Sequence, residues 1–320
     1  MTCYDVFNGD ADGLCALQQL RLAEPRECEL ITGVKRDINL LARVEAGAGD
    51  QITVLDVSLD KNREALLRIL EQGARVQYVD HHFAGEIPQH AALDALINTE
   101  STTCTSLLVN HMLDNRYSAW AVTGAYGDNL FESADRLARQ TGLCVEESEA
   151  LKELGTLLNY NGYGSALEDL YFPPDVLFRR LRAHASPFDF IARDEAFRTL
   201  RDGYAEDMAR GRACTPQIAS DSHILVLLPD APWARRVSGV LANELARGAP
   251  ERATALVNRM ADGSLRVSVR APLNKREGAD ALCMAFPTGG GRKAAAGINK
   301  LPADQLDAFT EKFIAAFGGA

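Results

Sequence analysis

Three short apolar segments near the start of the chain each end in carboxylate or imidazole side chains, and this pattern limits what the chain can fold into. Leu14, Leu17 and Leu20 follow the first segment at helical spacing, and strands that alternate with helices predict a parallel, doubly wound α/β sheet. Open α/β sheets place their sites at the carboxyl ends of the strands. We therefore expect one polar cluster there: Asp10 and Asp12 after residues 4–7, Asp56 after residues 52–55, and Asp80-His81-His82 after residues 76–79.

The other strands and helices of the first half are predicted from the same periodicities. One helix carries Leu66 and Ile69, and Ser101-Thr102-Thr103 opens another. The stretch from 117 to 158 is mainly helical and is interrupted by Gly127-Asp128-Asn129. We also expect strands at residues 28–34 and 95–98, a helix at residues 37–46 and a turn-rich segment at residues 159–164.

With 320 residues the chain is too long for one typical core, so two domains are expected. The first, residues 1–192, carries the doubly wound parallel sheet, and a helical linker follows at residues 193–212. The second, residues 213–320, is a smaller α/β domain. Its predicted strands are residues 224–228, 253–258 and 265–271, the last two joined through Asp262-Gly263, and its predicted helices are residues 233–247, 277–285 and 302–317.

The composition is that of a soluble globular protein, with 47% hydrophobic and 24% charged residues. The net charge of -10 disfavours long nucleic acid as a partner, because that partner needs a basic surface. No apolar run approaches the roughly 18 residues of a membrane span, and the N-terminus lacks the features of a cleavable leader. The seven cysteines form no C-x-x-C pair, so we expect reduced thiols in a cytoplasmic protein: Cys3, Cys15, Cys28, Cys104, Cys144, Cys214 and Cys283.

Each polar segment taken alone also has a purely structural explanation. The hexapeptide from Asn8 to Gly13 can direct alternating carboxylates at two metal ions, but short Asp-Gly segments are also common in solvated Asx turns. Asp56 can bridge two cations or simply cap the helix that follows. Adjacent histidines directly after a buried strand are less common, and Asp80 can orient one of the two imidazoles.

The order of the three segments, D-x-D, then an aspartate at a strand end, then D-H-H, resembles the DHH phosphoesterase superfamily, which includes nanoRNases, RecJ-like nucleases and bisphosphonucleoside phosphatases. Residues 289–297 resemble the glycine-rich signature of the DHHA1-type second domain, and Ser101-Thr102-Thr103 resembles the segment that opens the helix after the third motif. The resemblance spans nearly the whole chain. It implies two catalytic divalent ions, usually manganese, with magnesium or cobalt as alternatives.

The resemblance also assigns roles to individual residues. It implies that Asp10 binds the first ion and Asp12 the second, with Asp56 bridging both. His81 would complete the coordination of the second ion, and His82 would face the scissile phosphate. The fourth motif would supply one more metal ligand, Asp128, although Gly127-Asp128-Asn129 can also be an ordinary turn. The matching substrate-binding positions in the second domain are Arg270, Gly289, Gly290, Gly291 and Arg292.

Two positions depart from the pattern of the superfamily. Asn8 stands where relatives usually carry a histidine near the first aspartate, and a neutral amide is a weaker ligand than imidazole for manganese-type ions. Asn8 is therefore expected to be a weak metal ligand, with the first ion loosely held or completed by water. Arg292 stands where relatives often have histidine, and a guanidinium suits phosphate oxygens better than a metal.

We expect hydrolysis of phosphodiester or phosphomonoester bonds in short oligonucleotides or small nucleotides, with two ions about 4 Å apart activating a water molecule. One alternative is a pyrophosphate or polyphosphate hydrolase. Another is a non-catalytic nucleotide-binding protein with a weakened metal site. No membrane partner is expected, and the oligomeric state is left open, a homodimer included. The basic cluster of Arg179, Arg180 and Arg182 fits a short oligonucleotide or, more commonly, a solvated helix face.

Overall fold

The structure, a computed structural model, describes residues 1–318 and divides into two compact units, Met1–Asp202 and Gly203–Ala320. The division falls inside the long helix α9 (Glu195–Arg212), in the region predicted to be a helical linker. In the part of the chain that the structure describes, no helix is both long enough and apolar enough to cross a membrane.

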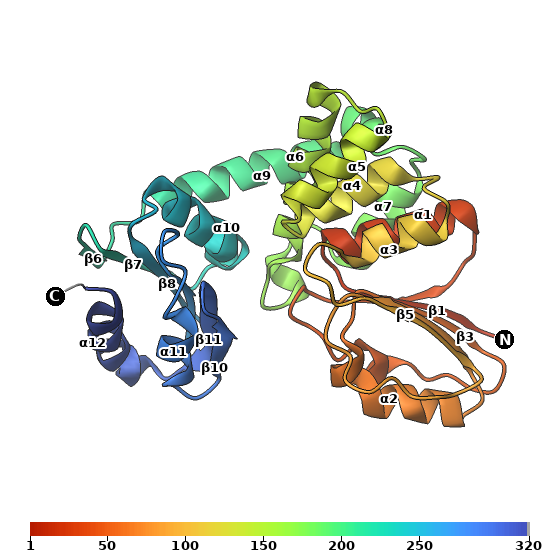
Figure 1. Ribbon diagram of the computed structural model, residues 1–320, viewed down its shortest axis with the longest axis horizontal. Coiled ribbons are helices and arrows are strands. Elements are labelled where there is room, and N and C mark those ends of the chain that lie inside the picture. The colour runs from red at the N-terminus through yellow and green to blue at the C-terminus, as the bar shows by residue number, and fades with distance from the viewer. Residues whose placement is uncertain (319–320) are drawn as a thin grey trace. The chain divides into compact units, whose positions relative to one another are not determined.

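Unit 1 is built on a five-stranded parallel sheet with the order β2-β1-β3-β4-β5. Helices α1 (Ala11–Ala23) and α3 (Thr105–Met112) lie on one side of this sheet and α2 (Leu59–Glu71) on the other (Figure 1). The predicted doubly wound parallel sheet is confirmed. Its strands are β1 (Cys3–Phe7), β2 (Glu29–Ile31), β3 (Gln51–Leu55), β4 (Arg75–Asp80) and β5 (Leu93–Ile97).

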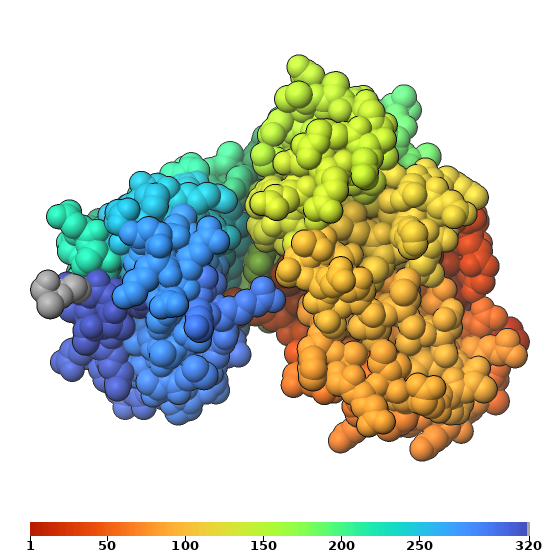
Figure 2. Space-filling model, in the orientation of Figure 1, coloured from red at the N-terminus to blue at the C-terminus, as the bar shows by residue number. Residues whose placement is uncertain are grey.

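The three central strands are apolar on both sides because helices cover both sides. Val54 of β3 and Tyr78 of β4 are neighbours across the ladder, and both are fully buried. The Tyr78 hydroxyl donates a 2.6 Å hydrogen bond to the carbonyl of Val57, so its polar end is satisfied inside the core. On the face shown in Figure 2, the orange atoms around α2 and the yellow atoms of α3 and α4 meet in a continuous surface.

A second layer of helices packs on α1 and consists of α4 (Ser118–Gly127), α5 (Phe131–Gln140), α6 (Val145–Gly162), α7 (Pro174–Arg182) and α8 (Pro187–Arg193). Glycines allow these helices to approach one another closely. A Cβ atom at Gly127 would clash with Ala11 of α1, and a Cβ at Gly155 would clash with the backbone of Thr123. The end of α4 is therefore brought against the start of α1, next to the ends of the strands.

Two local predictions in unit 1 are wrong. Residues 37–46 do not form an α-helix but contain only a short 3₁₀ helix, Leu40–Arg43, whose leucines fill the core below the sheet. Residues 159–162 are not a turn but the last helical turn of α6. Their polar side chains favour a turn locally, but burial and tertiary hydrogen bonds hold them in the helix. Asn161, for example, exchanges two hydrogen bonds with the backbone of Phe172.

The expectation that all seven cysteines are reduced is also wrong, because Cys3 and Cys28 form a disulfide. The reason is the strand register, which sequence spacing does not reveal. Tyr4 of β1 pairs with Glu29 of β2, and this places the preceding residues Cys3 and Cys28 side by side. The other cysteines are free thiols: Cys15, Cys104 and Cys283 are buried, Cys214 is partly exposed and Cys144 is exposed.

Unit 2 contains a six-stranded mixed sheet with the order β10-β11-β9-β8-β7-β6, in which only β7 and β8 are parallel neighbours. Alternate residues of β8 face opposite sides. Ala255 and Val257 join an aromatic core with Phe309 and Phe313, whereas Asn258 donates to Ala234. The elements are β6 (Ile218–Ala219), β7 (His223–Leu228), α10 (Pro232–Gly248), β8 (Ala253–Arg259), β9 (Leu265–Arg270), α11 (Ala279–Met284), β10 (Gly289–Arg292), β11 (Ala295–Leu301), a 3₁₀ helix (Ala303–Gln305) and α12 (Leu306–Phe317).

The disulfide is expected to stabilise unit 1. It links residues separated by 25 positions, and closing a loop of this length lowers the conformational entropy of the unfolded chain by an amount worth about 3.5 kcal/mol. Cys28→Ser should therefore lower the free energy of unfolding by about that amount, measured by denaturant titration with far-UV circular dichroism. The partly exposed Cys214→Ser is the control and should change little. Equal stability of Cys28→Ser and the unsubstituted protein would contradict a stabilising disulfide.

Candidate metal centre

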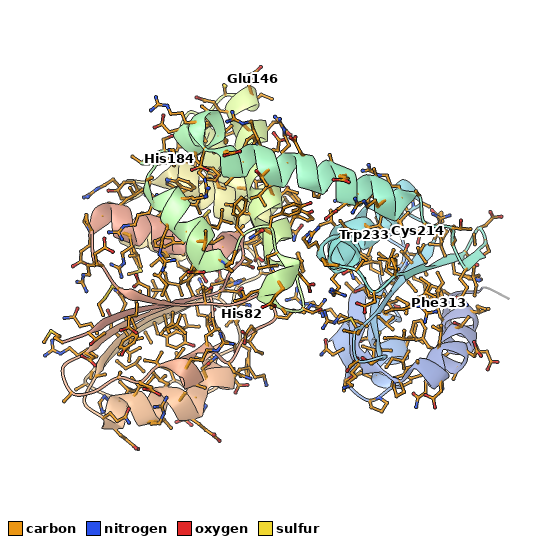
Figure 3. All side chains as sticks on the ribbon, turned by 180° about the vertical axis from the view of Figure 1, so that it is seen from behind. His82, Glu146, His184, Cys214, Trp233 and Phe313 are labelled. Carbon is orange, nitrogen blue, oxygen red and sulfur yellow. A yellow bond between two sulfur atoms is a disulfide. The ribbon has the colours of Figure 1, made fainter. Side chains whose placement is uncertain are left out.

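The predicted polar residues meet at the carboxyl edge of the sheet in unit 1. Asp80 is the last residue of β4, and His81 and His82 follow it. Asp10 caps the helix after β1, and Asp56 follows β3. The strand order reverses between β1 and β3, so this edge opens a crevice at the position where doubly wound sheets bind their ligands. Figure 3 shows His82 at this end of the strands.

Asp10 and Asp12 are fixed by backbone N–H groups. Asp10 Oδ1 accepts hydrogen bonds from the N–H groups of Asp12 (3.1 Å) and Gly13 (3.2 Å), which makes it the N-cap of α1. Both oxygens of Asp12 accept bonds from the start of α3, one from Thr105 N and one from Ser106 N, each at 2.8 Å. The turn is therefore structural, as an Asx turn would be, and it also presents both carboxylates at the crevice.

Asp56 has a backbone conformation that few residue types adopt. Its φ is +59°, in the left-handed region that Asp and Asn tolerate better than other non-glycine residues. Its N–H still donates to Val79 across the ladder, while its side-chain Oδ1 accepts from the Thr105 hydroxyl at 3.1 Å. Burial, together with the charges of Asp10 and Asp12, raises the pKa of Asp56 well above its usual value.

His81 Nε2 lies at the centre of a group of carboxylate oxygens. It is 3.3 Å from Asp56 Oδ1, 3.9 Å from Asp12 Oδ2 and 3.8 Å from Asp128 Oδ2. Three oxygens and one imidazole nitrogen form a hard donor set suited to manganese or magnesium. We call Asp12, Asp56, His81 and Asp128 the His81 site. Among the described residues, Asp56, His81 and His82 have ligand atoms that all lie within 4.8 Å of one another and could hold a metal ion. Asp12 and Asp128 lie within 4 Å of His81 Nε2, and a cation there would relieve the repulsion among the carboxylates.

His82 Nδ1 is hydrogen-bonded to Asp80, and His82 also offers a ligand atom within 4.8 Å of those of Asp56 and His81. The distance from His82 Nδ1 to Asp80 Oδ1 is 2.7 Å, against 3.9 Å to Asp56 Oδ1. Burial alone would lower the pKa of His82, but the hydrogen bond to Asp80 and the negative charge of Asp56 raise it to about 9. With 44% of its side chain exposed, His82 can offer a positive charge to an anion in the crevice.

Lys35 and Asn159 belong to the same cluster, and the sequence analysis missed both. The Lys35 ammonium lies 2.6 Å from Asp10 Oδ2 and 3.0 Å from Asn159 Oδ1. Burial alone would lower the pKa of Lys35, but the charge of Asp10, assisted by Tyr163 and Asp128, raises it well above its usual value. Lys35 could have been found by the rule that found the aspartates, because it directly follows the strand predicted at residues 28–34.

Asn159 carried no such signal, because it lies on α6 far along the chain and was assigned to a turn.

Asp128, which was predicted, is the C-cap of α4. Burial, strengthened by Asp12 and Asp10 and opposed by Lys35, raises its pKa to about 6. Asn8 was also predicted. Its Nδ2 donates to the Lys35 carbonyl at 3.4 Å, and its buried Oδ1 has no hydrogen-bond partner among residues 1–318.

Part of this cluster lines a cavity of about 370 Å³, whereas Asp12, Asp80 and Asn159 are not among the lining residues. The lining also includes the aromatic side chain of Phe83, which is 72% exposed. The cavity combines carboxylates that can hold a cation with cations that can hold an anion. The lining residues are Asn8, Asp10, Lys35, Ile38, Asp56, Ser58, Asp60, Lys61, His81, His82, Phe83 and Asp128.

Solved structures of known proteins share this architecture. A manganese-bound RecJ exonuclease superposes with a TM-score of 0.63 over 98% of this chain and 89% of its own, at 18% identity. The pGpG-specific phosphodiesterase PggH from Vibrio cholerae gives 0.55 over 98% of both chains at 14% identity. An exopolyphosphatase-related protein from Bacteroides fragilis gives 0.53 over 98% and 91% at 13% identity. The chain has the fold of these proteins. No family model and no curated protein matches the sequence.

Unit 2 holds the other predicted residues. The glycine run forms strand β10 and pairs with β11. A Cβ at Gly289 would clash with the Cys283 carbonyl, and Gly291 has a φ of +141°. The backbone therefore requires glycine at both positions, whether or not they contact substrate. A Cβ at Gly290 would meet open space. Arg270 Nε donates to Asn243 at 2.7 Å, and Arg292 is exposed. Their contact with substrate stays a prediction.

The helix face with three arginines is neutralised by carboxylates. Arg179 pairs with Asp175, Arg180 with Asp194 and Arg182 with Glu27. These contacts favour the interpretation of a solvated helix face.

Asp56→Asn should lower manganese affinity by at least about 100-fold, because it removes a charged donor from the His81 site while keeping a residue that tolerates positive φ. Isothermal titration calorimetry measures the change. The matched control is Asp60→Asn, which removes a carboxylate from the same cavity without altering the His81 site. Equal manganese affinity of both variants would show that Asp56 is not a ligand.

Proposed function

We propose that the protein is a divalent-metal-dependent phosphoesterase that hydrolyses phosphodiester or phosphomonoester bonds of short oligonucleotides or small nucleotides. The observation that carries this proposal is the approach of His81 Nε2 to within 4 Å of Asp12, Asp56 and Asp128. Manganese is the ion we expect, with magnesium or cobalt as alternatives. The manganese-bound RecJ structure with the same fold supports this choice.

Each residue has a distinct part in the proposed reaction. Asp12, Asp56, His81 and Asp128 would hold the ion, which when bound activates water and withdraws charge from a phosphoryl group. Asp80 fixes the orientation of His82, and the protonated His82 would donate to a phosphoryl oxygen as charge develops there. The resemblance of the sequence implies another ion, the first, held by Asp10 and Asp56. Lys35 Nζ lies 2.6 Å from Asp10 Oδ2, an oxygen that such an ion would use.

The exposed Phe83 favours a substrate with a nucleobase. An aromatic ring at the rim of a phosphate-binding cavity can stack on a base, and such stacking contributes about 1–3 kcal/mol. A cavity of about 370 Å³ has room for one nucleotide rather than a long strand. The net charge of -10 is in keeping with a small substrate. Arg270, Arg292 and the backbone of Gly290 are proposed to bind further phosphates.

Two alternatives stay open to test. A pyrophosphate or polyphosphate hydrolase is supported by the exopolyphosphatase-related protein of the same fold, but such substrates have no base for Phe83. A non-catalytic nucleotide-binding protein would need no complete metal site, and the intact His81 site argues against it. The pGpG-specific phosphodiesterase supports a dinucleotide instead. A cytoplasmic location and a homodimer stay predictions.

The purified protein with manganese should release mononucleotides from a dinucleotide such as pGpG, and chelation should stop the reaction. Chromatographic product analysis on a panel of dinucleotides, end-tagged short oligomers, a bisphosphonucleoside and pyrophosphate measures this. His81→Ala should lower kcat/KM at least about 1000-fold, because it removes a metal ligand. Asp94→Asn, on the exposed side of β5, is the control. Hydrolysis of pyrophosphate alone would select the first alternative, and binding without turnover the second.

Phe83→Ala should raise KM for a dinucleotide about tenfold, because stacking of about 1–3 kcal/mol is lost. It should leave hydrolysis of a phosphodiester without an aromatic base, such as a bis-alkyl phosphate, nearly unchanged. Steady-state kinetics on both substrates measures the difference. Leu67→Ala removes another exposed apolar side chain of the same unit and serves as the control. An equal loss on both substrates would contradict base stacking.

A further inference from the structure

Lys35 is held at both its backbone and its ammonium group, unlike the mobile lysines of a protein surface. Its backbone N–H donates to the carbonyl of Gly162 at the end of α6, at 2.9 Å. Its ammonium donates to Asp10 and Asn159 and lies 3.6 Å from Asp128 Oδ1. Only 21% of the side chain is exposed. The ammonium is therefore a fixed part of the cluster.

The Lys35 ammonium is hydrogen-bonded to the carboxylate oxygen of Asp10 that the first metal ion would need as a ligand. Asp10 Oδ1 accepts backbone N–H bonds from Asp12 and Gly13, as the oxygens of Asp12 do from α3, and Oδ2 is the oxygen of Asp10 that accepts no backbone bond. Lys35 Nζ lies 2.6 Å from that Oδ2. An ion at this place would have to displace the ammonium or lie beside a like charge. The other predicted ligand, Asn8, offers only a neutral amide oxygen.

The His81 site differs from this position because no ammonium is hydrogen-bonded to its donors among residues 1–318. Asp12 is bonded by backbone N–H groups and Asp56 by the Thr105 hydroxyl, and both of these donors are neutral. Asp128 lies between the two positions, with Oδ1 towards Lys35 and Oδ2 towards His81. The cluster thus consists of one position with an ammonium hydrogen-bonded to its carboxylate and one without, although His82 Nδ1 lies 3.9 Å from Asp56 Oδ1.

We propose that the Lys35 ammonium replaces one of the two divalent ions, so that each chain binds a single ion at the His81 site. The inference rests on the proposed function, since it concerns the same site. An ammonium carries one charge and three donors, enough to neutralise Asp10 and to offer a hydrogen bond to a phosphoryl oxygen. Unlike a bound ion, it is part of the chain and is not removed by chelation.

Counting ions tests this without measuring turnover. Isothermal titration calorimetry and metal analysis after gel filtration should give one manganese per chain for the unsubstituted protein. Lys35→Met removes the ammonium and frees Asp10 Oδ2, so it should give two. Lys61→Met is the matched control, because Lys61 also lines the cavity but is 60% exposed and pairs with Asp60. It should keep the count at one.

Electron paramagnetic resonance gives a second readout, since two neighbouring manganese ions produce a coupled spectrum and a single ion does not. Lys35→Gln loses the charge but keeps hydrogen bonding to Asn159, and it replaces Lys35→Met if circular dichroism shows that variant to be unfolded. Two ions in the unsubstituted protein overturn the inference, and so does a count of one in the folded Lys35 variant. A count of one without hydrolysis supports the inference and contradicts the proposed function instead.

Discussion

Repulsion among carboxylates at the carboxyl edge of the sheet is the constraint on which the rest of unit 1 depends. Asp10, Asp12 and Asp56 are each at most 2% exposed, and Asp128 adds a fourth negative charge. Buried carboxylates are tolerated only when hydrogen bonds or cations compensate them. Backbone N–H groups compensate part of this charge, and Lys35 compensates another part. The remaining negative charge is gathered around His81, where we propose that a divalent cation binds.

The fold brings these charges together because the ends of the strands carry some of them and the layer of helices carries the others. The reversal of strand order between β1 and β3 opens the crevice, and Asp10 and Asp56 enter it from the sheet. Asp128 and Asn159 enter from the helical layer, where small residues allow α4 and α6 to come close to α1 and to each other. A cation held at the centre would therefore tie the two layers together, and binding and stability are expected to be linked.

The parts of the site that follow strands could be predicted from the sequence. The apolar run that ends in Asp80-His81-His82 marks a strand end, and parallel strands end at a common edge, so the meeting of Asp12, Asp56 and His81 followed from local pattern alone. Other features depend on distant parts of the chain. The residues around Asn159 look like a turn and are helical because they are buried, and Cys3 joins Cys28 because of strand register.

The sequence by itself determined the class of fold, the edge at which the polar residues gather and the hard character of the donor set, because periodicity and strand ends are local properties. Only the tertiary structure decided how charge is distributed within that cluster. It placed the Lys35 ammonium on Asp10 and left Asp12, Asp56 and Asp128 around His81. The physical reason is that pairing of buried charges depends on distances of a few ångströms between segments far apart in the chain.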